Sequence, residues 1–194
     1  TSIAIPDSIT TIAEDAFVSC KALQSFTLSP NHPYFFLADG ALCRTVDNTL
    51  LFYPNARENR TYRIPDGIAA ISAYAFYDCD LLESVVIPDS ITQIPERAFY
   101  GCSALASVSL PDSLTEIGIA AFSFCAALTD IRLPASITEI SAGLFSGCSS
   151  LATLEIPDSV TIIGGDETSI RRQVDGDWYF LPAFRAAIHH PVPR

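Results

Sequence analysis

The stretch LLESVVIPDSITQIPERAFYGCSA (residues 81–104) holds one complete unit of a repeat that returns every 23 residues. Prolines at this constant spacing mark the repeat: Pro65, Pro88, Pro111, Pro134 and Pro157, with Pro6 starting a further unit. In most units a phenylalanine follows the proline by 11 residues and a cysteine follows it by 14 residues. A period of this length predicts a stacked repeat architecture and outweighs the local interpretation of any single segment.

Each unit predicts one coil of the chain. Its first part alternates apolar and variable residues, which is typical of a short strand with one buried face. Three such segments are 85–87, 108–110 and 131–133. The proline lacks an N–H group and ends the strand, and the Asp-Ser pair that follows favours a turn. ITQI (91–94) then predicts a second extended segment, and PERAFYG (95–101) a single helical turn with Phe99 and Cys102 on one face.

A single coil cannot be stable alone. About six apolar side chains contribute roughly 1.5–3 kcal/mol each when they are buried. Ordering the backbone costs about 1–2 kcal/mol per residue, which over a whole unit exceeds that gain. The coils are therefore expected to stack into a solenoid in which each coil contacts only its neighbours.

Stacking places the patterned cysteines in one straight row inside the molecule. The row comprises Cys20, Cys79, Cys102, Cys125 and Cys148. Zinc needs four ligands that converge on one point, which a row does not provide, and a disulfide needs Cβ atoms closer than stacked coils comfortably allow. These thiols are therefore predicted to be buried and inert, whereas Cys43, outside the pattern, is predicted to be the more exposed thiol.

The unit resembles a known repeat class. Its pattern LxxVxLPDSLTxIxxxAFxxCxx is similar to that of the leucine-rich repeats named for treponemal and BspA-like surface proteins, over about 1–29 and 62–165. The segment 31–65 is similar to an element that recurs in these proteins, with a hairpin. The resemblance implies a right-handed, curved leucine-rich-repeat solenoid with a parallel β-sheet on its concave face, short extended segments and helical turns elsewhere, and no enzymatic activity. It also implies an exported protein (cell surface, periplasmic or secreted), although no signal is visible in the chain.

Two departures from the period define the predicted domains. The leucine-rich repeat solenoid is expected over 1–165 and contains an irregular repeat at 30–64. In this repeat Asp39-Gly40 marks a turn, and the segments that flank Thr45–Asn48 predict a β-hairpin insertion. After Gly164-Gly165 the repeat ends, and 166–194 is expected to form a cap that covers the last coil.

The concave face is the predicted binding surface, because the residues between the buried strand positions point to it. These residues are Thr27, Thr61, Arg63, Ser84, Val86, Ser107, Ser109, Asp130, Arg132, Thr153 and Glu155. Arg132 with Asp130 and Glu155 is its most distinctive cluster, and the simpler interpretation of this cluster is a set of cross-strand charge pairs of little energetic worth. The expected function is that of a non-enzymatic scaffold for protein partners, with a homo-oligomer also possible.

Two other functions remain open. The first is a small-ligand or metal-binding module, in which the aromatic insertion (Tyr34, Phe35, Phe36 and Tyr53) and the cap frame a pocket. Packing of the oversized coil also explains the same rings. The second is a purely architectural spacer. The aspartates that follow the repeat prolines form a row that calcium prefers chemically, but aspartate also suits the turn, so no metal or cofactor is predicted.

Composition and residue placement exclude further classes. The formal net charge of −11 repels nucleic acid, and no apolar run approaches the length of a membrane-spanning helix. The three histidines (His32, His189 and His190) lie outside the regular coils, and no serine or cysteine is paired with a general base in the pattern. The sequence therefore predicts no catalytic residues.

Overall fold

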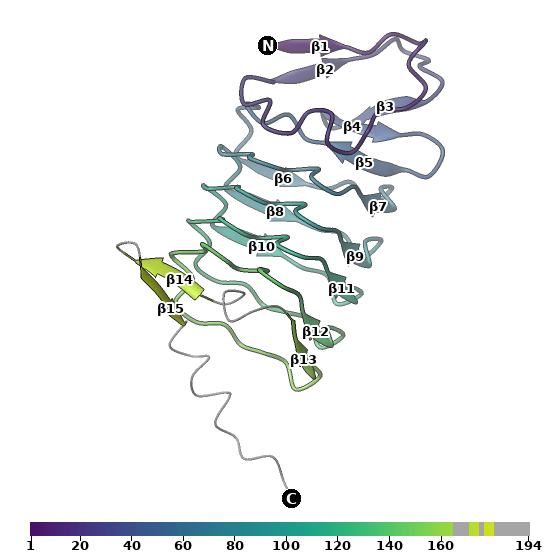
Figure 1. Cartoon of the computed structure of the whole chain (residues 1–194). Helices are drawn as coiled ribbons and strands as arrows, with labels where there is room; N and C mark the ends of the chain where they lie inside the picture. The colour runs from purple at the N-terminus through teal and green to yellow at the C-terminus, as the bar shows by residue number, and fades with distance from the viewer. Residues whose placement is uncertain (165–170, 175–176, 181–194) are drawn as a thin grey trace, which may run out of the picture.

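The computed structural model describes residues 1–164 and the backbone of 171–174 and 177–180. Successive coils lie one above the other along a single axis, and like segments of neighbouring coils run side by side (Figure 1). The predicted solenoid is confirmed.

One row of strands runs along the stack, and one strand comes from each of several coils. Its members are β1 (Ser2–Ala4), β2 (Ser25–Thr27), β6 (Thr61–Arg63), β8 (Ser84–Val86) and β10 (Ser107–Ser109). β1 pairs with β2, and β6, β8 and β10 form a parallel three-stranded sheet with β8 in the centre. The register joins identical repeat positions, so that Tyr62 lies beside Val85 and Val85 beside Val108.

The strand predicted at 131–133 does not form. Its coil contributes only an isolated bridge between Asp130 and Ser107. The same coils remain bonded elsewhere, for example from Phe122 N to Leu144 O at 3.1 Å, so the missing strand is a local feature of this segment.

A second row of short strands follows the proline turns, as the ITQI-like segments predict. It comprises β7 (Ala70–Ile71), β9 (Gln93–Ile94), β11 (Glu116–Ile117), β12 (Glu139–Ile140) and β13 (Ile162–Ile163). The turns themselves are closed by a hydrogen bond from the residue three positions on to the proline carbonyl, for example Ile91 N to Pro88 O at 3.0 Å.

The predicted helical turn is wrong for the part of the chain that the structure describes. The segment 95–101 consists of consecutive tight turns, because four coils hold residues in the left-handed region at two repeat positions and the first coil at one of them. These positions are occupied by Tyr74, Arg97, Ala120 and Gly143, and by Ser19, Asp78, Gly101, Phe124 and Gly147. A left-handed residue reverses the chain and stops a helix from propagating. The glycines at 101 and 147 meet this demand without strain.

The irregular repeat contains the hairpin predicted at 45–48 and a second hairpin at the predicted turn Asp39-Gly40. β3 (Phe35–Ala38) pairs antiparallel with β4 (Ala41–Arg44) through Asp39-Gly40, and β4 pairs antiparallel with β5 (Thr49–Phe52) through 45–48. β5 then pairs in parallel with β7, so it serves as the second extended segment of its coil.

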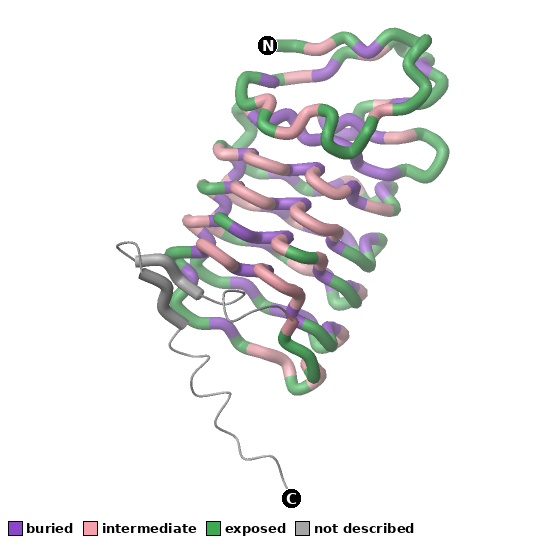
Figure 2. Tube along the Cα trace, viewed as in Figure 1, coloured by how far each residue is buried: buried purple, intermediate pink, exposed green. Residues whose placement is uncertain are grey.

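The core runs along the stack, and the buried positions recur at the same place in each coil (Figure 2). A continuous column of rings lies in it: Tyr53, Phe76, Phe99, Phe122 and Phe145, each stacked on the next. Tyr53 occupies the repeat position of these phenylalanines in the irregular repeat, so the column of stacked rings extends into that repeat.

Beyond residue 164, β14 (Arg171–Val174) and β15 (Asp177–Phe180) form an antiparallel hairpin. The rest of the predicted cap lies outside the described residues. Within those residues, no helix has the length and apolar character needed to cross a bilayer.

Candidate interaction surface

The predicted binding residues lie together on the solvent side of the first row of strands, which we call the strand face. The residues between them are buried: Tyr62, Val85, Val108, Ile131 and Leu154. The predicted residues themselves are exposed or half-buried. Registered pairing aligns Thr61, Ser84 and Ser107 in one row and Arg63, Val86 and Ser109 in the next.

The strand face is hollowed along its C-terminal half. A groove of about 550 Å³ runs over β8, β10 and the following coil. Small side chains form its floor, including Ser84, Val86, Ser107 and Ser109, and Asp112, Asp130 and Arg132 provide its charges.

The predicted charge cluster does not form ion pairs with itself. Within residues 1–164, Arg132 makes neither a side-chain hydrogen bond nor a salt bridge, and Asp130 and Glu155 are likewise without an ion-pair partner. By contrast, Arg63 at the same repeat position is paired with Asp66, with 3.1 Å between Nη2 and Oδ1.

A larger groove, of about 800 Å³, lies on a different side of the stack. Gln93, Glu116, Glu139 and Glu96 line it together with threonine side chains. Gln93 donates a hydrogen bond to Glu116 at 2.9 Å, and Glu96 is paired with Arg97. The sequence analysis did not single out this groove.

The aromatic insertion is mostly core. Phe35 and Tyr53 are 2% and 3% exposed, and Phe36 is half-buried against the core. Only Tyr34 of the four predicted residues is exposed, at 43%. Burial also raises the pKa of the Tyr53 hydroxyl to about 12. The rings therefore pack the oversized coil and leave no open aromatic pocket between them.

The cysteines form the predicted row, and four of them are fully buried. Each thiol donates to a backbone carbonyl of the preceding coil, from Cys102 to Phe76 at 3.0 Å and from Cys125 to Phe99 at 3.2 Å, for example. Cys20 is the exception, because it lies in the first described coil and is half-buried. Burial raises the pKa of the Cys148 thiol to about 12, which makes it a poor nucleophile.

The prediction for Cys43 is wrong. Its side chain is 0% exposed, because it lies in the main core cluster together with Leu50 and Tyr62. Burial raises the pKa of this thiol to about 12 as well.

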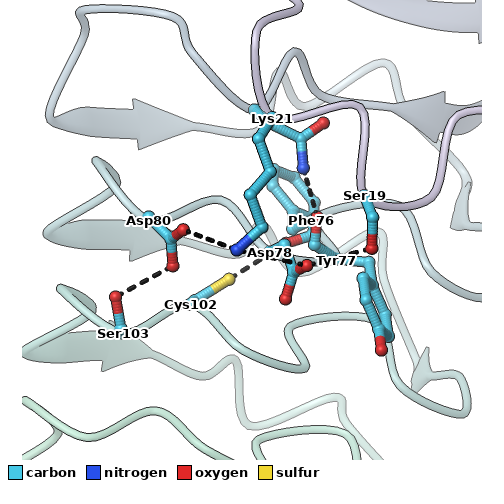
Figure 3. Close-up of polar contacts among 9 residues, drawn as sticks. Ser19, Lys21, Phe76, Tyr77, Asp78, Asp80, Cys102 and Ser103 are labelled. Atoms are coloured by element: carbon cyan, nitrogen blue, oxygen red, sulfur yellow. Dashed lines mark hydrogen bonds and ion pairs between the residues drawn. The ribbon is translucent and has the colours of Figure 1, made fainter.

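Lys21, the only lysine of the chain, joins coils across the insertion (Figure 3). Its Nζ lies 3.7 Å from Asp78 and 3.4 Å from Asp80, and Ser19 donates to Asp78 at 3.1 Å. Ser103 of the next coil donates to the same Asp80 at 2.9 Å, so that three coils are tied at this corner. The sequence analysis missed this contact because the partners are 59 residues apart.

Two of the aspartates after the prolines make side-chain contacts. Asp66 holds Arg63, and Asp7 accepts a hydrogen bond from Ser29 at 2.6 Å. Over the ranges that the structure describes, no group of three or more metal-ligating side chains converges.

Comparison with family models places the repeat in a known class. Six copies of the BspA type leucine rich repeat region match residues 1–36 and 52–167. The chain belongs to this family. The unmatched residues between the two ranges contain the hairpin strand β4, so the BspA-type repeat is interrupted where the structure shows the insertion. Proteins of this family are generally non-enzymatic scaffolds, commonly at surfaces or in interactions.

Several solved bacterial proteins share the BspA-type fold. A leucine rich cell surface protein from Faecalibacterium prausnitzii A2-165 is 33% identical over 84% of this chain, with a TM-score of 0.56. The leucine rich repeat protein of T. pallidum is 32% identical over 70% of the chain, with a TM-score of 0.54. A leucine-rich repeat protein from Bacteroides ovatus is 30% identical over 84%, with a TM-score of 0.56. The chain covers 37%, 64% and 44% of these three proteins, respectively. No match was found among curated protein sequences.

Proposed function

We propose that the solenoid is a non-enzymatic scaffold that binds a protein partner through the strand face. The observation that carries this proposal is the grouping of outward-facing residues along registered strands, over a groove of about 550 Å³. Solenoids commonly bind along such an extended face, because successive repeats present one continuous surface.

The surface chemistry supports a protein partner. Hydroxyl groups at 84, 107 and 109 offer donors and acceptors to a partner main chain, and Arg132 offers a charged donor. The family membership and the cell surface relative from Faecalibacterium prausnitzii favour an exported protein as well.

The pocket hypothesis for the insertion has less support. Phe35 and Tyr53 are buried, so a ligand would reach only Tyr34 without opening the core. A spacer without a partner remains the alternative that the experiment must distinguish.

The test is capture of partners from cell or matrix extract by immobilised protein, with the double variant Arg132→Ala/Glu155→Ala as the comparison. The matched control is Gln93→Ala/Glu116→Ala, which also removes one carboxylate and one polar side chain but lies in the other groove. A partner that is lost from the first variant and kept by the control supports the proposal. Equal capture by both variants, or no capture by the wild type, contradicts it.

A further inference from the structure

The coil that carries Arg132 is the one regular coil in which the residue after the proline is not aspartate. Aspartate stands there in the other coils that begin with a repeat proline, at Asp7, Asp66, Asp89, Asp112 and Asp158. In the Pro134 coil this position is Ala135, which is exposed.

The arginine of this coil also differs from its counterpart in its ion-pair partner. The strand face has two arginines at the same repeat position, Arg63 and Arg132, and each lies three residues before the residue in question. Arg63 is held by Asp66 at 3.1 Å. The turns are alike, since Ile68 N donates to Pro65 O at 3.0 Å and Ile137 N to Pro134 O at 3.1 Å. Ala135 has no carboxylate to offer Arg132, and Arg132 makes no salt bridge within residues 1–164.

We propose that Arg132 is the anchor of the strand face, and that it receives a carboxylate side chain from an extended polypeptide. A free guanidinium offers a bidentate, charge-assisted contact to a carboxylate, which is one of the stronger polar contacts at an interface. This inference rests on the proposed function, because it names the chemistry of the partner at the same surface.

The charges around Arg132 define the partner further. Asp112 and Asp130 line the same groove, and Glu155 lies at the same repeat position one coil further on. Three carboxylates around one guanidinium repel a polyanion such as a sulfated glycan, whereas they attract basic side chains. The fitting partner is a mixed-charge segment in which an acidic residue is flanked by lysine or arginine.

The extended conformation follows from the small side chains of the floor. Ser84, Ser107 and Ser109 project little from their strands, so that a partner main chain can approach within hydrogen-bonding distance of their hydroxyls.

The experiment is an NMR titration of the full 15N-labelled chain, observed at the arginine Nε–H signals. The probes are acetyl-Lys-Glu-Lys-amide and sodium sulfate. The peptide is expected to shift the Arg132 signal in a saturable way and to leave Arg63 unchanged. The key variant is Ala135→Asp, which copies the residue found in the other coils and should restore the internal pair. This variant is expected to lower the peptide affinity about tenfold, because the peptide loses one charge-assisted contact.

Three outcomes overturn the inference: equal shifts at Arg63 and Arg132, an unchanged affinity in Ala135→Asp, or a larger shift of Arg132 with sulfate than with the peptide. Backbone signals of Ser107 and Ser109 separate the two proposals. If they respond to the peptide equally in the wild type and in Ala135→Asp, the strand face still binds polypeptide and only the role of Arg132 is wrong. The variant Arg132→Gln is a second test, which removes the guanidinium without adding a carboxylate and should lower the affinity to the same extent.

Discussion

At the scale of single residues, a serine two positions after the proline ties four of the coils to the coil before. Ser90 donates to Ile68 O at 2.7 Å, and Ser159 donates to Ile137 O at 2.7 Å. The sequence pattern showed this serine but indicated only a turn former, since the carbonyl that accepts the bond belongs to another coil. The contact becomes visible only once the coils are stacked.

The variant Ser90→Ala is expected to lower the free energy of unfolding by about 1 kcal/mol, because it leaves the Ile68 carbonyl without this donor. Urea denaturation measures the change. Ser8→Ala is the matched control: Ser8 holds the same repeat position, but its hydroxyl has no partner among residues 1–164. Equal losses in the two variants would contradict the contact.

The backbone of Ala120 is strained, because its φ of 54° lies in the left-handed region. The next coil has Gly143 at the same position, with a φ of 66°. Ala120→Gly is expected to raise the free energy of unfolding by about 0.5–1 kcal/mol, because glycine adopts this conformation without a Cβ clash. Ala121→Gly should lower it instead, since Ala121 is buried and has no positive φ. Thermal denaturation of both variants checks the opposite signs.

At the scale of elements, the hairpin between β4 and β5 is stabilised by an ion pair at its turn. The guanidinium of Arg44 lies 2.7 Å from Asp47, and Asp47 also accepts from the Thr49 N–H at 3.2 Å. The Arg44 hydrogen bond is the main reason why the pKa of the Asp47 carboxyl falls to about 2.

Because the folded pKa of Asp47 is lowered, its contribution to stability is complete above the pKa of the unfolded chain, near 3.8, and is lost as the pH falls toward 2. A carboxyl 13C titration should show Asp47 ionising well below the other exposed aspartates. In Arg44→Gln the midpoint is expected to return toward the ordinary value. A wild-type midpoint near 3.8 would contradict the described pair.

The turn at Asp39-Gly40 and the hairpin at 45–48 could be predicted, because turn residues act locally. The burial of Cys43 could not, since it depends on core residues from other segments, such as Tyr62, that pack with it in the folded chain. The helical turn was mispredicted for a similar reason. The apolar spacing of Phe99 and Cys102 suits a helix. However, backbone N–H groups of this segment bond to the next coil instead of to their own, as Phe99 N does to Ala121 O at 2.9 Å.

At the scale of the whole molecule, the column of stacked rings links the coils into one cooperative unit. Phe99 is stacked on Phe76 at 4.7 Å and on Phe122 at 5.3 Å. Phe99→Ala is expected to cost about 3–5 kcal/mol, since it opens a cavity in the middle of the column. Phe17→Ala in the first described coil should cost less, because Phe17 is only half-buried. Chemical denaturation compares the two, and an equal or reversed order would contradict a continuous column.

The strand face could be predicted from the sequence because alternation along a strand fixes which side chains point outward. The state of its charges could not be predicted. Cross-strand pairing of Arg132 was the simpler interpretation, yet within residues 1–164 this arginine has no ion-pair partner, and the residue that differs from the Arg63 coil is Ala135 at the turn. Lys21 likewise contacts Asp78 and Asp80 because the folded stack brings their coils side by side, which the sequence does not reveal (Figure 3).

Thiol labelling of the native protein at pH 8 with an aromatic disulfide reagent tests the stacked arrangement most directly. The row and β4 bury Cys43, Cys79, Cys102, Cys125 and Cys148, and only Cys20 is partly accessible. We expect at most one thiol to react in the native state and all 6 cysteines to react in denaturant. Rapid reaction of all of them without denaturant would show that like residues do not align inside a common core.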